Sequence, residues 1–160
     1  MSTGKPLSSD ADRLATGAGR VSAASYRDRM DLEGAQQWLD RYVAAWVSYD
    51  RDQIGALFSD DISYRYHPSD EPVVGREAVV ASWLGEGEAG SASTRDEPGT
   101  FDAAYAPVAV DGETVVATGS SWYRETPGGP VVRTYDNCFV MRFDADGRCT
   151  AFTEYYVRRP

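Results

Sequence analysis

The feature that most constrains the fold is a change in the spacing of apolar side chains near residue 100. Beyond it, large apolar residues alternate with smaller or polar ones over four long stretches, which is the period expected of β-strands. Short segments rich in Gly, Pro and Asp separate the stretches at 111–112, 126–130 and 144–147 and are typical of hairpin turns. The sequence therefore predicts consecutive antiparallel strands at 101–110, 113–125, 131–143 and 148–157.

Before residue 100 the apolar residues recur at intervals of three and four, as on one face of a helix. The first predicted helix carries an inner face of Ala35, Trp38, Leu39, Tyr42, Val43 and Trp46. Asp50 and Gln53 form a capping pair that opens a second, short helix, with Ile54, Leu57 and Phe58 inward and Asp60 and Asp61 at its end.

A strand at 62–66 follows the second helix, and the segment 73–76 leads into a third helix. The inner face of this third helix consists of Val79, Val80, Trp83 and Leu84. The fold class expected is therefore α+β, with three N-terminal helices packed on a curved, mostly antiparallel sheet. A chain of 160 residues is about the size of one domain.

The domain is expected to cover 32–160, and 1–31 is expected to be a disordered N-terminal tail, because it holds few large apolar side chains and shows no period. The segment 85–99 also lacks a period, and it is long for a connection inside a compact domain. It is interpreted either as a lid or as a slack loop.

Turn positions fix the register of the strands, and the register decides which side chains share a face. If Phe143 pairs with Arg148, Asn137 lies opposite Glu154 and Phe139 lies opposite Phe152. The face predicted to be concave, beneath the helices, holds Ala104, Ala106, Val108, Ala117, Gly119, Ser121, Tyr123, Arg133, Tyr135, Asn137, Phe139, Met141, Phe143, Phe152, Glu154 and Tyr156. The opposite face is smaller and mixed, with Cys149 among its residues, and is expected to pair with a copy of itself in a homodimer.

Charge and composition narrow the range of partners. The net charge of −9 leaves no basic surface for phosphates, so binding to nucleic acid or to an anionic membrane is not expected. No apolar run reaches the roughly 18 residues of a membrane span, and no signal-peptide pattern is present, so a cytoplasmic location is expected. Cys138 and Cys149 have no neighbours at zinc-ligand spacing, and neither a metal nor a cofactor is expected.

Several stretches resemble the SnoaL-like superfamily, the cone-shaped α+β fold shared by nuclear transport factor, ketosteroid isomerase, limonene epoxide hydrolase and scytalone dehydratase. The resemblance covers roughly 32–157 and rests on the segments 41–45 (RYVAA), 56–61 (ALFSDD), 74–78 (VGREA) and 143–148 (FDADGR). It implies a fold that hosts enzymes, binding proteins and transport factors alike.

The ketosteroid isomerases match this chain at one catalytic position. Tyr42 corresponds to the phenol that they use in their oxyanion hole. The resemblance places their general-base aspartate near Tyr66 and their protonated aspartate near Phe139, so both carboxyl groups are missing here. The resemblance therefore does not imply the isomerase activity itself.

The limonene epoxide hydrolases and scytalone dehydratases also match only in part. Tyr64 and Glu154 resemble the water-binding tyrosine and one acid of the epoxide hydrolases, whereas Gly119 and Ser121 replace their Arg-x-Asp pair. Scytalone dehydratase relies on more than one histidine, and this chain has only His67. Neither activity follows from the resemblance.

The residues that remain predict a pocket between helices and sheet, centred on Glu154 beside Asn137. A carboxyl group among aromatic rings has a raised pKa and accepts protons more readily near neutral pH, while amide and phenol groups can donate to an oxyanion. The expected chemistry is the isomerisation, cyclisation or dehydration of a small, mostly apolar molecule with a carbonyl group. Predicted catalytic residues are Glu154, Asn137, His67 and Tyr42; predicted ligand-binding residues are Trp46, Tyr64, Tyr66, Trp83, Ser121, Tyr135, Phe139, Phe152 and Tyr156.

Each of these residues also has a structural interpretation. Glu154 can be a satisfied acceptor for a neighbouring side chain, and His67 before Pro68 can be a strand-end residue bonded to backbone. The tryptophans can be core residues, since aromatic rings bury large areas. A non-catalytic module that binds a small ligand or a protein therefore stands as the alternative function.

Overall fold

The computed structural model describes residues 30–86 and 95–160, and it confirms the α+β fold class. The expected tail at 1–31 lies almost wholly outside these residues, as does the middle of the loop at 85–99. The described helices and strands are α2 (Leu32–Ser48), α3 (Arg51–Leu57), β1 (Phe58–Arg65), β2 (Val73–Val74), α4 (Arg76–Leu84), β3 (Phe101–Asp111), β4 (Thr114–Arg124), β5 (Val131–Phe143) and β6 (Cys149–Arg158).

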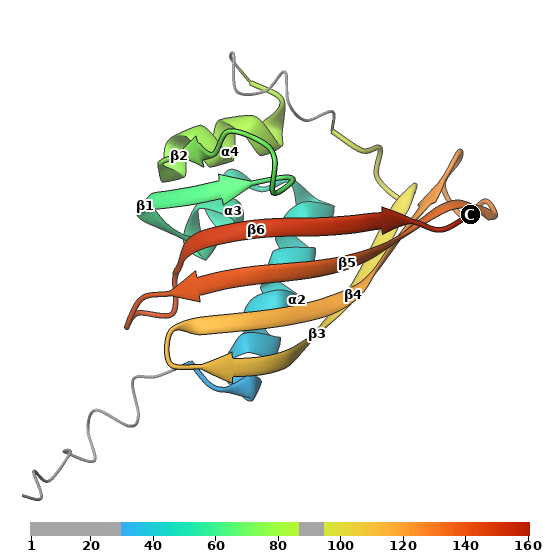
Figure 1. Ribbon diagram of the computed structural model, residues 1–160. Coiled ribbons are helices and arrows are strands. Elements are labelled where there is room, and N and C mark those ends of the chain that lie inside the picture. Colours follow the sequence, from blue (N-terminus) through green and yellow to red (C-terminus); the bar gives the residue numbers. More distant parts are fainter. Residues whose placement is uncertain (1–29, 87–94) are drawn as a thin grey trace, which may run out of the picture.

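The strands form one sheet in the order β2-β1-β6-β5-β4-β3. All neighbours are antiparallel except β1 and β6, which run parallel. The long strands β3 to β6 curve together, and the three helices lie on one side of the sheet, with α2 crossing behind β4 and β5 (Figure 1). The side chains between the helices and this concave face make up the core.

Helix α2 has the boundaries that its capping residues dictate. The Asp31 side chain accepts a hydrogen bond from the backbone N–H of Gly34 at 2.7 Å, and Tyr49 ends the helix in a left-handed conformation. Its inner face buries Trp38, which packs edge-on against Phe143 with the ring centroids 5.3 Å apart. The predicted helical face is therefore the face that meets the sheet.

The predicted boundary between the second helix and the first strand is wrong. Helix α3 ends at Leu57, and strand β1 begins directly at Phe58, so Asp60 and Asp61 lie in the strand and not in a helix-ending turn. The polar run suggested a turn, but here it occupies an irregular stretch of the β1–β6 pairing. The two acids are held there by an ion pair from Arg76 to Asp60 and a 2.8 Å bond from Ser59 to Asp61.

The predicted faces of β3 are reversed over most of the strand. Ala103 and Tyr105 pair with Ser121 and Gly119 and point into the core, whereas Ala104, Ala106 and Val108 are exposed. The register shifts between Pro107 and Ala109, so the strand carries one extra residue there. A single inserted residue moves every side chain beyond it to the other face.

The predicted β5–β6 register is off by two residues. Phe139 lies opposite Glu154, and Asn137 lies opposite Tyr156. One residue of the difference arises at the turn, where Phe143 pairs with Cys149 and not with Arg148, and the other arises from the register shift between Arg142 and Phe143. A shift of two keeps each side chain on its expected face, so Asn137 and Glu154 remain diagonal neighbours on the concave side.

The pairing at the turn also corrects the placement of Cys149. This residue was expected on the convex face, but it pairs with both Phe143 and Phe58 and is fully buried. It belongs to the core, where burial raises the pKa of its thiol above the ordinary value.

Candidate functional site

A cavity opens between the concave sheet and the helices, and its volume is about 390 Å³. Its floor comes from β4, β5 and β6, and helices α2 and α4 supply the opposite wall. Such a volume suits a small organic molecule. The residues that line the cavity are Tyr42, Trp46, Tyr49, Tyr64, Tyr66, Trp83, Asp96, Tyr105, Ser121, Tyr123, Arg133, Tyr135, Asn137, Glu154 and Tyr156.

A row of three polar side chains crosses the floor of this cavity. Asn137 donates from Nδ2 to Oε1 of Glu154 at 2.6 Å, and the Ser121 hydroxyl lies 3.3 Å from Oδ1 of Asn137, to which it donates. Ser121 and Asn137 are 2% and 7% exposed, so protein surrounds the row. An ionised carboxylate can only accept, so Asn137 presents its N–H to Glu154 and its amide oxygen to the Ser121 hydroxyl, which donates to it.

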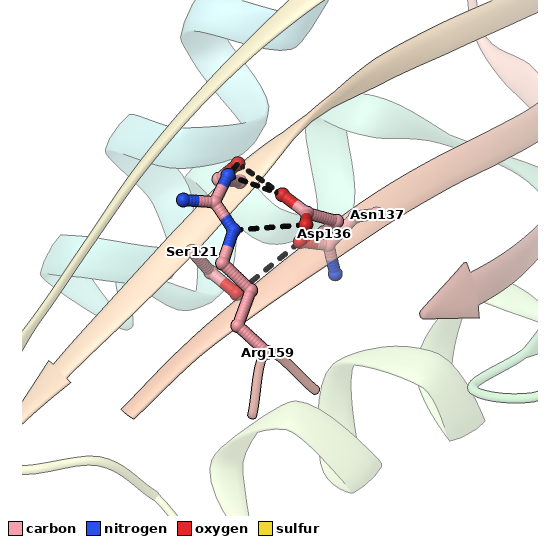
Figure 2. A network of polar contacts seen from close by, with 5 residues as sticks. Ser121, Asp136, Asn137 and Arg159 are labelled. Atoms are coloured by element: carbon pink, nitrogen blue, oxygen red, sulfur yellow. Dashed lines mark hydrogen bonds and ion pairs between the residues drawn. The ribbon is translucent and has the colours of Figure 1, made fainter. Parts of the chain in front are cut away.

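The residues one step along β4 and β5 point to the opposite face of the sheet. Figure 2 shows the Arg159 side chain reaching Asp136, the neighbour of Asn137 on β5; the Arg159 guanidinium bonds to Asp136 at 2.6 Å and contacts Ser120. The Arg159 hydrogen bond lowers the pKa of Asp136 to about 2. Successive side chains of a strand point to opposite faces. Ser120 and Asp136 therefore lie in a charged network on the convex face, whereas Ser121 and Asn137 point into the cavity.

The carboxyl group of Glu154 has a strongly perturbed pKa. Burial raises it from the ordinary value to about 7, and the Asn137 hydrogen bond opposes this only in part. Within the described part of the chain no cation forms an ion pair with Glu154. A carboxyl group of this kind is half ionised near neutral pH, where it can both accept and return a proton.

The raised pKa predicts that Glu154 weakens the fold as the pH rises. Between about pH 4.5 and 7 the folded protein keeps the Glu154 proton that the unfolded chain has lost, so stability is highest at the acid end and falls across this window. The expected loss is about 3 kcal/mol, and it should be absent in Glu154→Gln. Urea unfolding of both proteins at pH 5 and pH 8 measures the difference.

Removing any carboxylate charge can alter the pH dependence of stability, so the comparison of the wild type with Glu154→Gln needs a matched variant. Glu113→Gln removes the same charge from an exposed position that pairs with Arg142 outside the cavity. Equal pH dependence in the wild type and in Glu154→Gln would mean that Glu154 is not desolvated in the folded state.

The tyrosines around the carboxyl group are neutral hydrogen-bond donors. The hydroxyl oxygens of Tyr42 and Tyr64 lie 3.2 Å apart, and burial raises the pKa of both phenols well above the ordinary value. Burial, together with the nearby Glu154, does the same for Tyr105. These phenols keep their protons at physiological pH, so they can stabilise negative charge on a ligand oxygen.

The mouth of the cavity carries a second carboxyl group, that of Asp96. Its backbone N–H donates to the Tyr49 hydroxyl at 3.0 Å, and the same hydroxyl accepts the indole N–H of Trp46 at 3.1 Å. Burial raises the pKa of Asp96, and hydrogen bonding with Trp46 and the charge of Arg133 oppose this rise. Arg133 lies over the ring of Tyr123, 4.7 Å from its centroid.

Ten of the thirteen predicted site residues line the cavity. They are Glu154, Asn137, Tyr42, Trp46, Tyr64, Tyr66, Trp83, Ser121, Tyr135 and Tyr156. Phe139 and Phe152 lie in the core instead, and Phe152 stacks on Tyr64 with the ring centroids 4.6 Å apart. His67 bonds to Ser69 at 2.7 Å and packs edge-on against Tyr156, beside the cavity and not in its lining.

Five further lining residues were not among the predicted site residues. Tyr123 and Arg133 had been placed on the concave face, and the reversed register of β3 hid Tyr105. Tyr49 and Asp96 come from a helix end and a loop without periodicity. For these last two no sequence pattern gave a signal.

Two further observations concern the described residues 30–86 and 95–160. They contain no cluster of three or more His, Cys, Asp or Glu side chains placed to hold a metal ion. None of the helices in this part of the chain is long and apolar enough to cross a membrane.

Helices on the concave side of a curved sheet, with a lined cavity between them, define the class of pocketed α+β cone proteins. Within this class the chain belongs to the SnoaL-like domain family, whose model matches residues 39–152, more than half of its length. This confirms the resemblance seen in the sequence. No curated protein matches the chain at significant similarity.

Solved structures of known proteins share the fold at low sequence identity. A protein from Kribbella flavida, provisionally described as a ketosteroid isomerase, is 15% identical with a TM-score of 0.56, and the alignment covers 81% of this chain and 82% of that one. An LEH-like epoxide hydrolase from M. tuberculosis is 18% identical with a TM-score of 0.54, and the alignment covers 79% of this chain and 84% of that one. At these identities the likeness shows the fold alone.

Proposed function

We propose that the protein is an enzyme that moves a proton next to a carbonyl group of a small molecule, without a cofactor. The observation that carries the proposal is the Glu154 carboxyl group, which lies in a lined cavity, has a pKa of about 7 and makes no ion pair with any described residue. Active sites commonly perturb a carboxyl group in this way so that it can work at neutral pH.

In the proposed reaction Glu154 acts first as a base and then as an acid. Its carboxylate takes a proton from the carbon beside the carbonyl, and the electron pair of the broken C–H bond forms the C=C bond of an enolate. The carbonyl π electrons move to the oxygen, which accepts a hydrogen bond from the phenols of the Tyr42–Tyr64 pair. Glu154 then returns its proton to carbon, at the same position or at another position conjugated with it.

Asn137 takes a different role from the one expected of it in the sequence. Its amide donates to the Glu154 carboxyl at 2.6 Å, so in this proposal it orients the base and is not the main oxyanion donor. Ser121 in turn orients Asn137. His67 has no part in the proposal, because it lies outside the cavity lining.

The lining also alters the expected ligand. Eight tyrosines, Asp96 and Arg133 offer polar groups around the aromatic surfaces, so the proposed substrate is a flat molecule with oxygen substituents and not a purely apolar one. Isomerisation, cyclisation and dehydration all remain within this reaction class.

The experiment uses 2-tetralone, a fused bicyclic aromatic ketone, as a probe of proton abstraction. The protein is incubated with it in D₂O, and loss of the α-proton NMR signal is followed against buffer alone. The proposal predicts exchange that is faster than in buffer and saturates with ketone. Binding of the ketone without faster exchange would favour the non-catalytic binding module instead.

We also propose that two copies of the chain pair through the convex face. Val108, Val140, Tyr155 and Val157 are exposed there in spite of their apolar side chains, beside the Asp136–Arg159 ion pair. Solution scattering is expected to give twice the mass of one chain, and Val140→Lys should shift the mass towards one chain. A wild-type mass of one chain would contradict the pairing.

A further inference from the structure

The indole N–H of Trp83 differs from those of two other tryptophans. Trp38 donates to the Leu57 carbonyl at 3.1 Å, and Trp46 donates to the Tyr49 hydroxyl at the same distance. Trp83 is only 5% exposed, and its Nε1 is the single buried side-chain nitrogen or oxygen in residues 30–86 and 95–160 that has no hydrogen-bond partner. A buried donor without an acceptor is costly, and native structures rarely keep one without a reason.

The Trp83 side chain that carries this donor lines the cavity. Trp83 lies on α4 and lines the wall opposite the sheet, with its ring 6.3 Å from that of Tyr64 and 5.1 Å from that of Tyr42. The indole N–H reaches the Tyr64 hydroxyl closely enough for a weak hydrogen-bonding contact that lowers the pKa of that phenol, but the geometry falls short of a full hydrogen bond. A small movement of the Tyr64 hydroxyl would therefore complete the bond.

A ligand oxygen in the cavity would supply a cause for this movement. Tyr42, Tyr64 and Trp83 carry three donor hydrogens, and the structure has one bond among them, between the two phenols. An oxygen atom of a ligand in the cavity is an additional acceptor. If it accepts the Tyr64 hydrogen, the lone pairs of the Tyr64 oxygen remain available to Tyr42 and Trp83.

We propose that Trp83 is a positioning residue for ligand binding: a ligand oxygen draws the Tyr64 hydroxyl into the cavity, and the Tyr64 oxygen then accepts the Trp83 N–H. The cavity therefore selects molecules with an acceptor oxygen at the α4 wall over hydrocarbons of the same shape. This inference rests on the proposed function for the chemistry of the ligand and adds the place where its oxygen binds.

The first test compares the stabilities of Trp83→Phe and Trp46→Phe without a ligand. Both variants lose ring contacts, but Trp46→Phe also removes a bonded donor, whereas Trp83→Phe removes an unbonded one, so Trp83→Phe should lower the urea midpoint of unfolding less than Trp46→Phe does. A fall with Trp83→Phe as large as that with Trp46→Phe would show that the N–H is already bonded in the empty protein, which overturns the inference.

The second test follows the indole N–H of Trp83 in ¹H–¹⁵N NMR spectra, assigned by its loss in Trp83→Phe. Saturating 2-tetralone should move this proton signal downfield, and tetralin, the hydrocarbon of the same shape, should not. Trp83→Phe should weaken ketone binding roughly 2-fold to 10-fold and leave tetralin binding unchanged. An unmoved signal, or equal shifts with both compounds, overturns the inference.

These results are distinguishable from a failure of the proposed function. The NMR shift and the ketone-to-hydrocarbon preference report on the oxygen site alone and need no turnover. A shifted signal without α-proton exchange would support the role of Trp83 and contradict catalysis by Glu154. Exchange with an unmoved Trp83 signal would support catalysis by Glu154 and contradict the role of Trp83.

Discussion

Glu154→Gln is expected to lower the rate of α-proton exchange in 2-tetralone by roughly 100-fold to 10,000-fold, the range that general-base catalysis contributes. Glutamine has the shape of glutamate, and its Oε1 can still accept the bond from Asn137, so the geometry of the row should persist. What is lost is the carboxyl group of the cavity floor, which can take a proton near neutral pH. The rates are measured by NMR in D₂O at pH 7 to 8.

Two control variants make this result specific. Glu113→Gln removes an exposed charge paired with Arg142 and should leave the exchange rate unchanged. Asp96→Asn removes the carboxyl group at the mouth of the cavity, and it should lower the exchange rate less than Glu154→Gln does. If Asp96→Asn abolished exchange and Glu154→Gln did not, the base would be Asp96 and the assignment of Glu154 would be wrong.

Gly119→Ala is expected to destabilise the fold by roughly 3 kcal/mol or more, near the upper end for overpacking. A Cβ atom at this position would lie 2.0 Å from the Ala104 carbonyl oxygen and 2.5 Å from Cδ1 of Tyr105. The strands β3 and β4 therefore approach too closely here for any side chain. The glycine lets the Tyr105 ring reach the cavity, so ligand binding should weaken as well.

Gly55→Ala is the matched control for this substitution. Gly55 lies in helix α3, and a Cβ atom there would meet only ordinary contacts at 3.8 and 3.9 Å. Alanine is the better helix former, so the variant should be unchanged or more stable by up to about 1 kcal/mol. Equal urea unfolding of Gly119→Ala and the wild type would mean that β3 does not approach β4 as the structure shows.

The order of elements and the sheet could be predicted because both depend on repeated local patterns. The spacing of Trp38, Leu39 and Tyr42 defines a helical face, and hairpin turns between alternating stretches define neighbouring strands. The pairing of Asn137 with Glu154 survived an error of two residues in the register, because side chains two apart share a face.

The inward face of β3 could not be predicted, because an irregularity in a strand has no clear sequence pattern. The extra residue near Val108 placed Tyr105 in the cavity, where alternation from the Asp111-Gly112 turn had placed Ala104 and Ala106. The turn fixes the register only as far as the bulge.

Asp96 was missed for a different reason. It lies in a loop, and a contact such as its 3.0 Å bond to Tyr49 joins residues 47 positions apart in the chain. Contacts of this kind depend on how helix α2 sits on the sheet, which no local pattern encodes. The cavity floor follows from strand alternation, but its mouth depends on tertiary packing.

The central claim is that Glu154 is a desolvated carboxyl group that changes charge near neutral pH. Its side-chain carboxyl carbon can be titrated by ¹³C NMR in glutamate-labelled protein, with the signal assigned by its disappearance in Glu154→Gln. The account predicts a midpoint at about pH 7. A midpoint near 4.5, the ordinary range of glutamate, would show that water solvates the group, and Glu154 would then be a poor base at neutral pH.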